Sequence, residues 1–156
     1  MKKLAAQYQI PFVINDNIKV ALEVDADGVH IGQDDMSVEE ARKLLGEDKI
    51  IGVSAHNVKE ALKAQKGGAD YLGVGAVCAT STKKDANVVS KEEIKKIKEA
   101  VDIPIVAIGG IKKDNIDALT GTGIDGVAVV SAIFGAKDIT KDTKELLKTV
   151  KKMKQK

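Results

Sequence analysis

The stretch that decides the fold is residues 50–75, with the sequence IIGVSAHNVKEALKAQKGGADYLGVG. It begins and ends with nearly continuous apolar runs, residues 50–54 and 71–75, and such runs are typical of parallel strands buried on both faces. Between them, Val58, Ala61 and Leu62 recur at helical spacing. A strand, a helix and a second strand in this order predict a βαβ unit, in which the two strands are parallel.

The same alternation continues on both sides of this unit. Four more short apolar runs are expected to be strands: residues 11–15, 28–32, 104–108 and 126–130. Helical stretches lie between them, and two begin with a serine that is followed three residues later by a glutamate. These pairs, Ser37 with Glu40 and Ser90 with Glu93, match the capping box that marks a helix N-terminus. The repeated alternation predicts an α/β fold with a parallel sheet.

Three short turns resemble one another where a helix is expected to lead into a strand. Each contains an aspartate beside small residues, at residues 26–28, 68–70 and 123–126. We predict that these aspartates accept hydrogen bonds from nearby backbone N–H groups, as aspartates in turns commonly do. Glycines inside the strands, such as Gly52 and Gly73, favour the tightly filled interior of a barrel.

Chain length limits how much of a barrel the sequence can form. A closed (βα)₈ barrel has eight strands and runs from about 200 residues upward, whereas this chain has 156 residues and about six predicted strands. Residues 1–8 are typical of the tail of a helix and not of a first strand. The simplest interpretation is a TIM-type (βα) barrel that lacks about its first two βα units, with residues 1–156 forming one partial barrel domain.

Composition excludes several classes of protein. Lysine and arginine total 25 against 23 acidic residues, and the net charge of +2 gives no reason to expect a nucleic-acid partner. No apolar run reaches the roughly 18 residues that a membrane helix needs. Cys78 is the only cysteine, so neither an internal disulfide nor a cysteine-based metal site is expected. We therefore expect a cytoplasmic protein without a nucleic-acid or membrane partner.

Polar residues gather where the predicted strands end, which in a parallel α/β fold is the edge that carries the active site. Asp16 and Asp35 follow two successive strands. They could share a Mg²⁺ ion, which binds few carboxylates and completes its shell with phosphate oxygens. Lys83 and the hydroxyls of Thr80 and Thr82 are donors of the kind that bind phosphate.

Two later strand ends expose backbone N–H groups. Gly109 and Gly110 follow the strand that would be the seventh of a complete barrel, and Val130 and Ser131 follow the eighth. This is the usual phosphate position in such barrels. One anion here and a second on a metal beside Lys83 imply two phosphorylated groups.

Several of these residues also have a purely structural interpretation. Asp35 can be merely a loop residue at the start of a helix. Gly109 and Gly110 can be merely a tight turn, without a role in binding phosphate. His56 follows a strand and can cap the next helix or donate to a carbonyl, while His30 is interpreted as a hydrogen-bonded core residue. The segment of residues 78–90 is the longest expected loop, either a plain connection or a lid that closes over substrate.

Together these motifs resemble the thiamine phosphate synthase (thiamine-phosphate pyrophosphorylase) family, from about residue 5 to residue 136. The matching segments occur in order: FVIND at 12–16, GVHIGQDD at 28–35, GVSAH at 52–56, GVG at 73–75, TSTKKD at 80–85, AIGGI at 107–111 and VVSAI at 129–133. The resemblance implies an N-terminally truncated member of a (βα)₈ barrel family. It also implies a Mg²⁺-dependent transferase of thiamine biosynthesis, which joins hydroxymethylpyrimidine diphosphate to a thiazole phosphate and releases pyrophosphate.

The resemblance implies a role for each site residue. Asp16 and Asp35 are the implied metal ligands, and Asn15 lies near the diphosphate. The implied catalytic residues are Ser54, which contacts the reacting pair, and Lys83, which binds the diphosphate. The residues implied to contact the thiazole phosphate are Thr80, Thr82, Gly110, Val130 and Ser131. The implied mechanism is dissociative: Mg²⁺ and Lys83 stabilise the departing pyrophosphate, and the thiazole nitrogen captures a pyrimidine carbocation.

The sequence departs from the family pattern at one strand. The family's second strand carries a Gln, an Arg and a Lys that bind the diphosphate, and the chain shows no counterpart. Arg42, its only arginine, falls in a predicted helix. Two alternatives therefore stay open: a thiazole tautomerase-like paralogue, with a histidine at the His56 position, and a catalytically inactive remnant that binds phosphate or self-associates through its open barrel edges.

Overall fold

The structure, a computed structural model, describes residues 1–78 and 88–153. Across these residues six strands form one parallel sheet in the order β1-β2-β3-β4-β5-β6. The strands are β1 (Val13–Asn15), β2 (Gly28–Ile31), β3 (Ile50–Ala55), β4 (Tyr71–Val74), β5 (Ile105–Ile108) and β6 (Gly126–Ala128). Each predicted strand is confirmed, and the sheet is parallel as expected.

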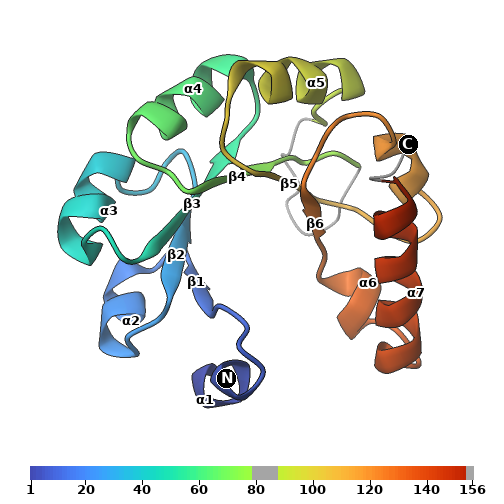
Figure 1. The fold of residues 1–156 in the computed structure, drawn as a ribbon, viewed down its shortest axis with the longest axis horizontal. Helices are drawn as coiled ribbons and strands as arrows, with labels where there is room; N and C mark the ends of the chain where they lie inside the picture. The colour runs from blue at the N-terminus through green and yellow to red at the C-terminus, as the bar shows by residue number, and fades with distance from the viewer. Residues whose placement is uncertain (79–87, 154–156) are drawn as a thin grey trace.

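Helices alternate with the strands. They are α1 (Lys2–Gln7), α2 (Ile18–Glu23), α3 (Val38–Leu45), α4 (Val58–Lys66), α5 (Lys91–Ala100), the 3₁₀-helix η1 (Ile116–Leu119), α6 (Ser131–Phe134) and α7 (Ile139–Met153). Figure 1 shows the strands curled along an arc, with α2 to α5 and α7 on its outer side. The fold is therefore a TIM-like half-barrel. No helix in the described ranges combines the length and the apolar character needed to cross a membrane.

The core lies between the sheet and this outer layer of helices. Ile51, Leu72 and Ile105 of the central strands are completely buried. Helix α4 packs on β3 and β4 with the small residues Ala61 and Ala64, which are its buried positions, because small side chains let the helix lie close to the sheet. Of the apolar positions noted at helical spacing, Ala61 is buried, whereas Leu62 lies beside this stripe and is 45% exposed.

The two predicted capping boxes have different outcomes. The box at Ser37 is complete, because the Ser37 and Glu40 side chains each accept a hydrogen bond from the other residue's backbone N–H. At Ser90 only half of it forms: the Ser90 hydroxyl accepts from the Glu93 N–H, but Glu93 Oε1 accepts from the N–H of Val58 instead. The first N–H groups of α4 have no acceptor within their own helix. Glu93 supplies an acceptor for one of them, the N–H of Val58.

The aspartates of the three similar turns accept backbone hydrogen bonds, as predicted. The donors are the N–H groups of Phe12 to Asp27, Ile51 to Asp70 and Ile105 to Asp125, at 2.7, 2.7 and 2.8 Å. Each aspartate precedes one strand and holds the start of the strand before it. These aspartate contacts therefore recur at every second strand, on the edge of the sheet where the strands begin.

Arg42 belongs to the same edge. Its guanidinium lies 2.7 Å from Asp70 Oδ2 and also donates to the carbonyls of Gly46, Lys49 and Gly68. The predicted position of Arg42 in a helix is confirmed, because it lies in α3. Its hydrogen bonds join α3 to the starts of β3 and β4, so Arg42 has a structural role at this edge.

We expect Asp27→Ala to lower the free energy of unfolding by about 1–2 kcal/mol, because the Phe12 N–H loses a charged acceptor. Urea unfolding measures the change. Asp102→Ala, at another exposed loop aspartate, is the control and should stay within about 0.5 kcal/mol of the parent chain. Equal losses in the two variants would show that the Asp27 contact does not hold β1.

Candidate functional site

A cavity of about 200 Å³ lies where the carboxyl ends of β3 to β6 meet. Its walls include Ser54 from β3, Gly75 after β4, Gly109 and Gly110 after β5, and Val130 and Ser131 after β6. Four residues predicted to belong to the site, Ser54, Gly110, Val130 and Ser131, are therefore brought together. This edge is opposite to the one held by the aspartate contacts.

The turn after β5 depends on its two glycines. Gly109 and Gly110 have φ values of +96° and +66°, in the left-handed region that favours glycine. A Cβ atom on Gly109 would lie 2.7 Å from Cα of Ala76, so the turn also packs closely against the segment after β4. Asn115 Nδ2 holds the Gly110 carbonyl at 2.9 Å. The two glycines thus form a tight turn, and this turn is one wall of the cavity.

Ser131 begins the short helix α6 and faces the same cavity. The first N–H groups of a helix have no acceptor within that helix, and they attract anions. Val130 precedes the helix and is exposed. The glycine turn and the start of α6 therefore lie together on the wall of a cavity large enough for a small anionic group.

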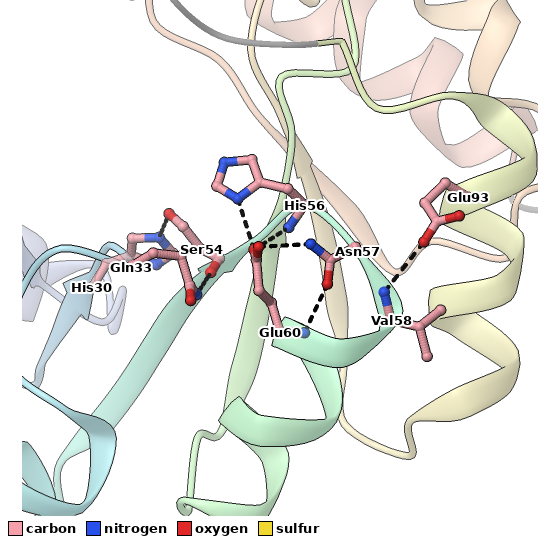
Figure 2. A network of polar contacts seen from close by, with 8 residues as sticks. All are labelled: His30, Gln33, Ser54, His56, Asn57, Val58, Glu60 and Glu93. Carbon is pink, nitrogen blue, oxygen red and sulfur yellow. Dashed lines mark hydrogen bonds and ion pairs between the residues drawn. The ribbon is translucent and has the colours of Figure 1, made fainter.

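Ser54 is held from two directions, as Figure 2 shows. Its hydroxyl lies 3.0 Å from Nε2 of His30, and its carbonyl accepts a hydrogen bond of 2.6 Å from Nε2 of Gln33. The other ring nitrogen of His30, Nδ1, lies 3.0 Å from the hydroxyl of Tyr71. The interpretation of His30 as a hydrogen-bonded residue is confirmed, but it is half-buried in β2 and borders an interior cavity, so it is not a core residue.

His56 lies just before the next helix and contacts the side chain of Glu60. Both its backbone N–H and its ring Nδ1 contact Glu60 Oε2, at 2.9 and 2.8 Å, and Asn57 is the N-cap of α4 (Figure 2). Partial burial opposes ionisation of Glu60, but hydrogen bonds from His56 and Asn57 outweigh it and lower the pKa of this carboxyl. The interpretation of His56 as the cap is therefore wrong, because Asn57 is the N-cap and the His56 ring contacts a carboxylate instead of a carbonyl or a helix N–H. The ring also borders the cavity.

Asp16 and Asp35 follow the neighbouring strands β1 and β2, and both are exposed. The N–H of Asp16 donates to the His30 carbonyl at 2.7 Å, while Asp35 Oδ2 accepts from the Gly32 N–H at 2.7 Å. No group of three or more potential ligands that could hold a metal occurs among the described residues. Two carboxylates still fit Mg²⁺, because this ion is commonly bound by one or two carboxylates together with substrate phosphates and water.

Comparison with known proteins places this site in a family. Residues 1–133 match the family described as thiamine monophosphate synthase. The chain belongs to this family.

Two relatives named thiamine-phosphate synthase show how far the match extends. The protein of Clostridium acetobutylicum is 53% identical over 152 residues, and that of Methanobrevibacter smithii is 54% identical over 151 residues. Each alignment covers 97% of this chain and 72% of the relative. A solved structure, the thiamine phosphate pyrophosphorylase from Pyrococcus furiosus, superimposes with a TM-score of 0.88 at 47% identity, over 97% of this chain and 73% of that one.

In this member of the thiamine monophosphate synthase family, the other predicted site residues that the structure describes lie outside the cavity that Ser54 borders. Asn15 borders a neighbouring cavity of about 410 Å³ inside the half-barrel, together with His30 and Tyr71. Asp35 borders a separate pocket beside Gln33. The predicted residues Thr80, Thr82 and Lys83, with most of the predicted loop of residues 78–90, lie outside the described residues.

Sequence reasoning missed Gln33, which donates to the Ser54 carbonyl, and Tyr71, which contacts Ser54's partner His30. Tyr71 lies in the predicted strand of residues 71–75, and Gln33 lies in the GVHIGQDD segment. The signal that could have found Tyr71 is strand register, because Tyr71 and His30 both lie opposite Gly52 on the strand between them.

Proposed function

We propose that the chain is a thiamine-phosphate synthase, a transferase that joins hydroxymethylpyrimidine diphosphate to a thiazole phosphate and gives thiamine phosphate and pyrophosphate. The observation that carries this proposal is the identity of 53% and 54%, over 97% of the chain, to two relatives with that name. A cavity at the carboxyl ends of the strands, with a glycine turn and a helix start on its wall, supports it. Nothing in the comparisons favours the tautomerase alternative.

In this function the cavity takes the thiazole phosphate. The N–H groups of Gly110 and Ser131 and the backbone of Val130 bind its phosphate, with the hydroxyls of Thr80 and Thr82 as further donors. Support comes from the position of Gly110, Val130 and Ser131 on one cavity wall. Backbone N–H groups suit this role because they donate in fixed directions without reorganisation.

The diphosphate has its own set of residues. We assign it to Lys83 and Asn15, with a Mg²⁺ ion held by Asp16 and Asp35. When bound, Mg²⁺ supplies positive charge to the pyrophosphate oxygens. The support for the metal ligands is that both carboxylates are exposed and follow adjacent strands.

The chemistry then requires charge stabilisation more than a base. The bond between the pyrimidine methylene carbon and the diphosphate oxygen breaks, and its electrons leave with pyrophosphate. Lys83 stabilises that negative charge, and the hydroxyl of Ser54 donates a hydrogen bond to the reacting groups. A new bond forms between the same carbon and the thiazole nitrogen. Preorganised donors of this kind lower the barrier because the charge develops in the transition state.

The proposal includes the setting in which the chain works. Residues 1–156 act as one domain in the cytoplasm on small-molecule substrates, which agrees with one continuous sheet and a net charge of only +2. Strands β1 and β6 are the edges of that sheet, and copies of the chain could pair there. Sedimentation of the purified chain tests this self-association.

The decisive experiment measures pyrophosphate released by the purified chain with both substrates and Mg²⁺, with circular dichroism in the same buffer as the test of folding. Release that requires both substrates is the expected result. Omitting the thiazole phosphate separates transfer from hydrolysis of the diphosphate. A folded chain that releases no pyrophosphate contradicts the proposal, and calorimetry with the thiazole phosphate alone then shows whether it is a remnant that only binds phosphate.

A further inference from the structure

Two rings fill the space left by two strand glycines inside the half-barrel. His30, Gly52 and Tyr71 lie side by side in register across β2, β3 and β4, and Ser54 pairs with Gly73 further along the same strands. A Cβ atom on Gly52 would overlap the ring of Tyr71, and one on Gly73 would lie 2.7 Å from Cε1 of His30. Glycine at both positions is therefore what allows the two rings to lie across the sheet.

The rings connect the interior to the candidate site through hydrogen bonds. Tyr71 Oη and His30 Nδ1 are 3.0 Å apart, and His30 Nε2 and Ser54 Oγ are also 3.0 Å apart. The ring centroids of His30 and Tyr71 are separated by 5.5 Å. Ser54 borders the cavity assigned to the thiazole phosphate, whereas Tyr71 borders the interior cavity. We call Tyr71, His30 and Ser54, which these two hydrogen bonds join, the relay.

The directions of these two hydrogen bonds depend on the tautomer of His30. Burial raises the pKa of Tyr71, and its neutral phenol can donate to Nδ1 of His30, which lies 3.0 Å away. When Nδ1 accepts, the proton of a neutral imidazole is on Nε2. Nε2 then donates to Ser54 Oγ, and the hydroxyl proton of Ser54 is left to point away from His30.

We propose that Tyr71 and His30 are positioning residues that fix the Ser54 hydroxyl as a hydrogen-bond donor to the phosphorylated substrate. The proposal rests on the proposed function, because that function places Ser54 at the reacting groups. The backbone of Ser54 is held separately by Gln33, so the relay controls only the direction of the hydroxyl. A donor that is already oriented stabilises developing charge without reorganisation, unlike a freely rotating hydroxyl.

The first test reads the tautomer of His30 without any turnover. The chain contains two histidines, so the imidazole ¹⁵N NMR spectrum of the intact protein is simple, and His56→Asn assigns it. His30 is expected in the Nε2–H form, and Tyr71→Phe is expected to remove this preference. An Nδ1–H form in the parent chain, or an unchanged tautomer in Tyr71→Phe, overturns the proposal even if the chain is an active synthase.

The second test uses the chain's two tyrosines as a matched pair. Tyr71→Phe is expected to lower kcat about tenfold with KM changed less than about twofold. A Ser54 hydroxyl without a fixed direction stabilises the transition state less, while substrate binding changes little. Tyr8→Phe removes a phenol that is 70% exposed and is expected to leave kcat unchanged. Equal effects of the two substitutions contradict the relay.

A double-mutant cycle shows whether Tyr71 acts through Ser54. Once Ser54→Ala has removed the hydroxyl, adding Tyr71→Phe is expected to cause no further loss of kcat, whereas independent sites would give additive effects. A full additional tenfold loss overturns the proposal. At His30 the expected order of activity is His30→Gln above His30→Leu, since the amide keeps an N–H donor for Ser54; the reverse order counts against a positioning role.

Discussion

Replacing Asp35 by asparagine is expected to lower kcat/KM for pyrophosphate release by about 100-fold or more, because a bound metal ion contributes several kcal/mol of charge stabilisation. The asparagine oxygen can still accept the hydrogen bond that Asp35 Oδ2 receives from the Gly32 N–H at 2.7 Å. The turn should therefore survive while the negative charge that attracts Mg²⁺ is lost. Initial rates over a range of Mg²⁺ concentrations measure the effect.

Asp34 provides the control for this experiment. Asp34→Asn removes the same charge from the neighbouring exposed position, and its rate is expected to stay within about twofold of the parent chain, as for a surface substitution away from the site. Circular dichroism of both variants checks that the fold is intact. If both variants lose activity equally, or if Asp35→Asn keeps the parent rate and the parent Mg²⁺ dependence, Asp35 is not a metal ligand.

Gly109→Ala is expected to lower the free energy of unfolding by about 2–3 kcal/mol, since strained backbone and overpacking each cost about 1 kcal/mol or more. The new Cβ would lie 2.7 Å from both Cα and Cβ of Ala76, at a φ of +96°. The turn must then move away from Ala76 and carry Gly110 with it. We expect KM for the thiazole phosphate to rise about tenfold, equivalent to about 1.4 kcal/mol of lost binding.

Gly121 separates backbone strain from crowding. It has a φ of +75°, but no atom lies within 4 Å of its Cβ position. Gly121→Ala should therefore cost only the left-handed strain, about 1 kcal/mol, and leave KM unchanged. Urea unfolding and steady-state kinetics on the two variants give the comparison. A Gly109→Ala chain as stable as Gly121→Ala would show that the close approach to Ala76 does not constrain the site.

Much of the fold could be predicted from the sequence because its signals are local. Apolar runs between helical stretches located all six strands, and the alternation with helices gave a parallel sheet. The complete capping box at Ser37 and the role of Asp70 and its two counterparts depend on short-range turn chemistry. Prediction failed at Glu93, where a neighbouring element decides the outcome, because Glu93 binds the start of α4 instead of completing the box at Ser90.

The site was predicted less completely, because its geometry depends on contacts between distant segments. The cavity wall follows from the rule that parallel strands carry sites at their carboxyl ends, and Ser54, Gly110 and Ser131 lie there. The contact between His30 and Tyr71 joins residues 41 positions apart. It depends on the register of three strands and on the space above Gly52, and no local pattern contains that information.

The aspartate contacts at the starts of the strands have a consequence for how such a chain can be cut and rebuilt. Asp27 joins β1 to the turn before β2, Asp70 does so for β3 and β4, and Asp125 for β5 and β6. The starts of the strands are thus joined in three pairs, β1 with β2, β3 with β4 and β5 with β6, and one aspartate joins each pair. A circular permutation or an inserted domain should be tolerated best between these pairs, after β2 or after β4. A break there leaves both partners of every aspartate contact in one continuous segment.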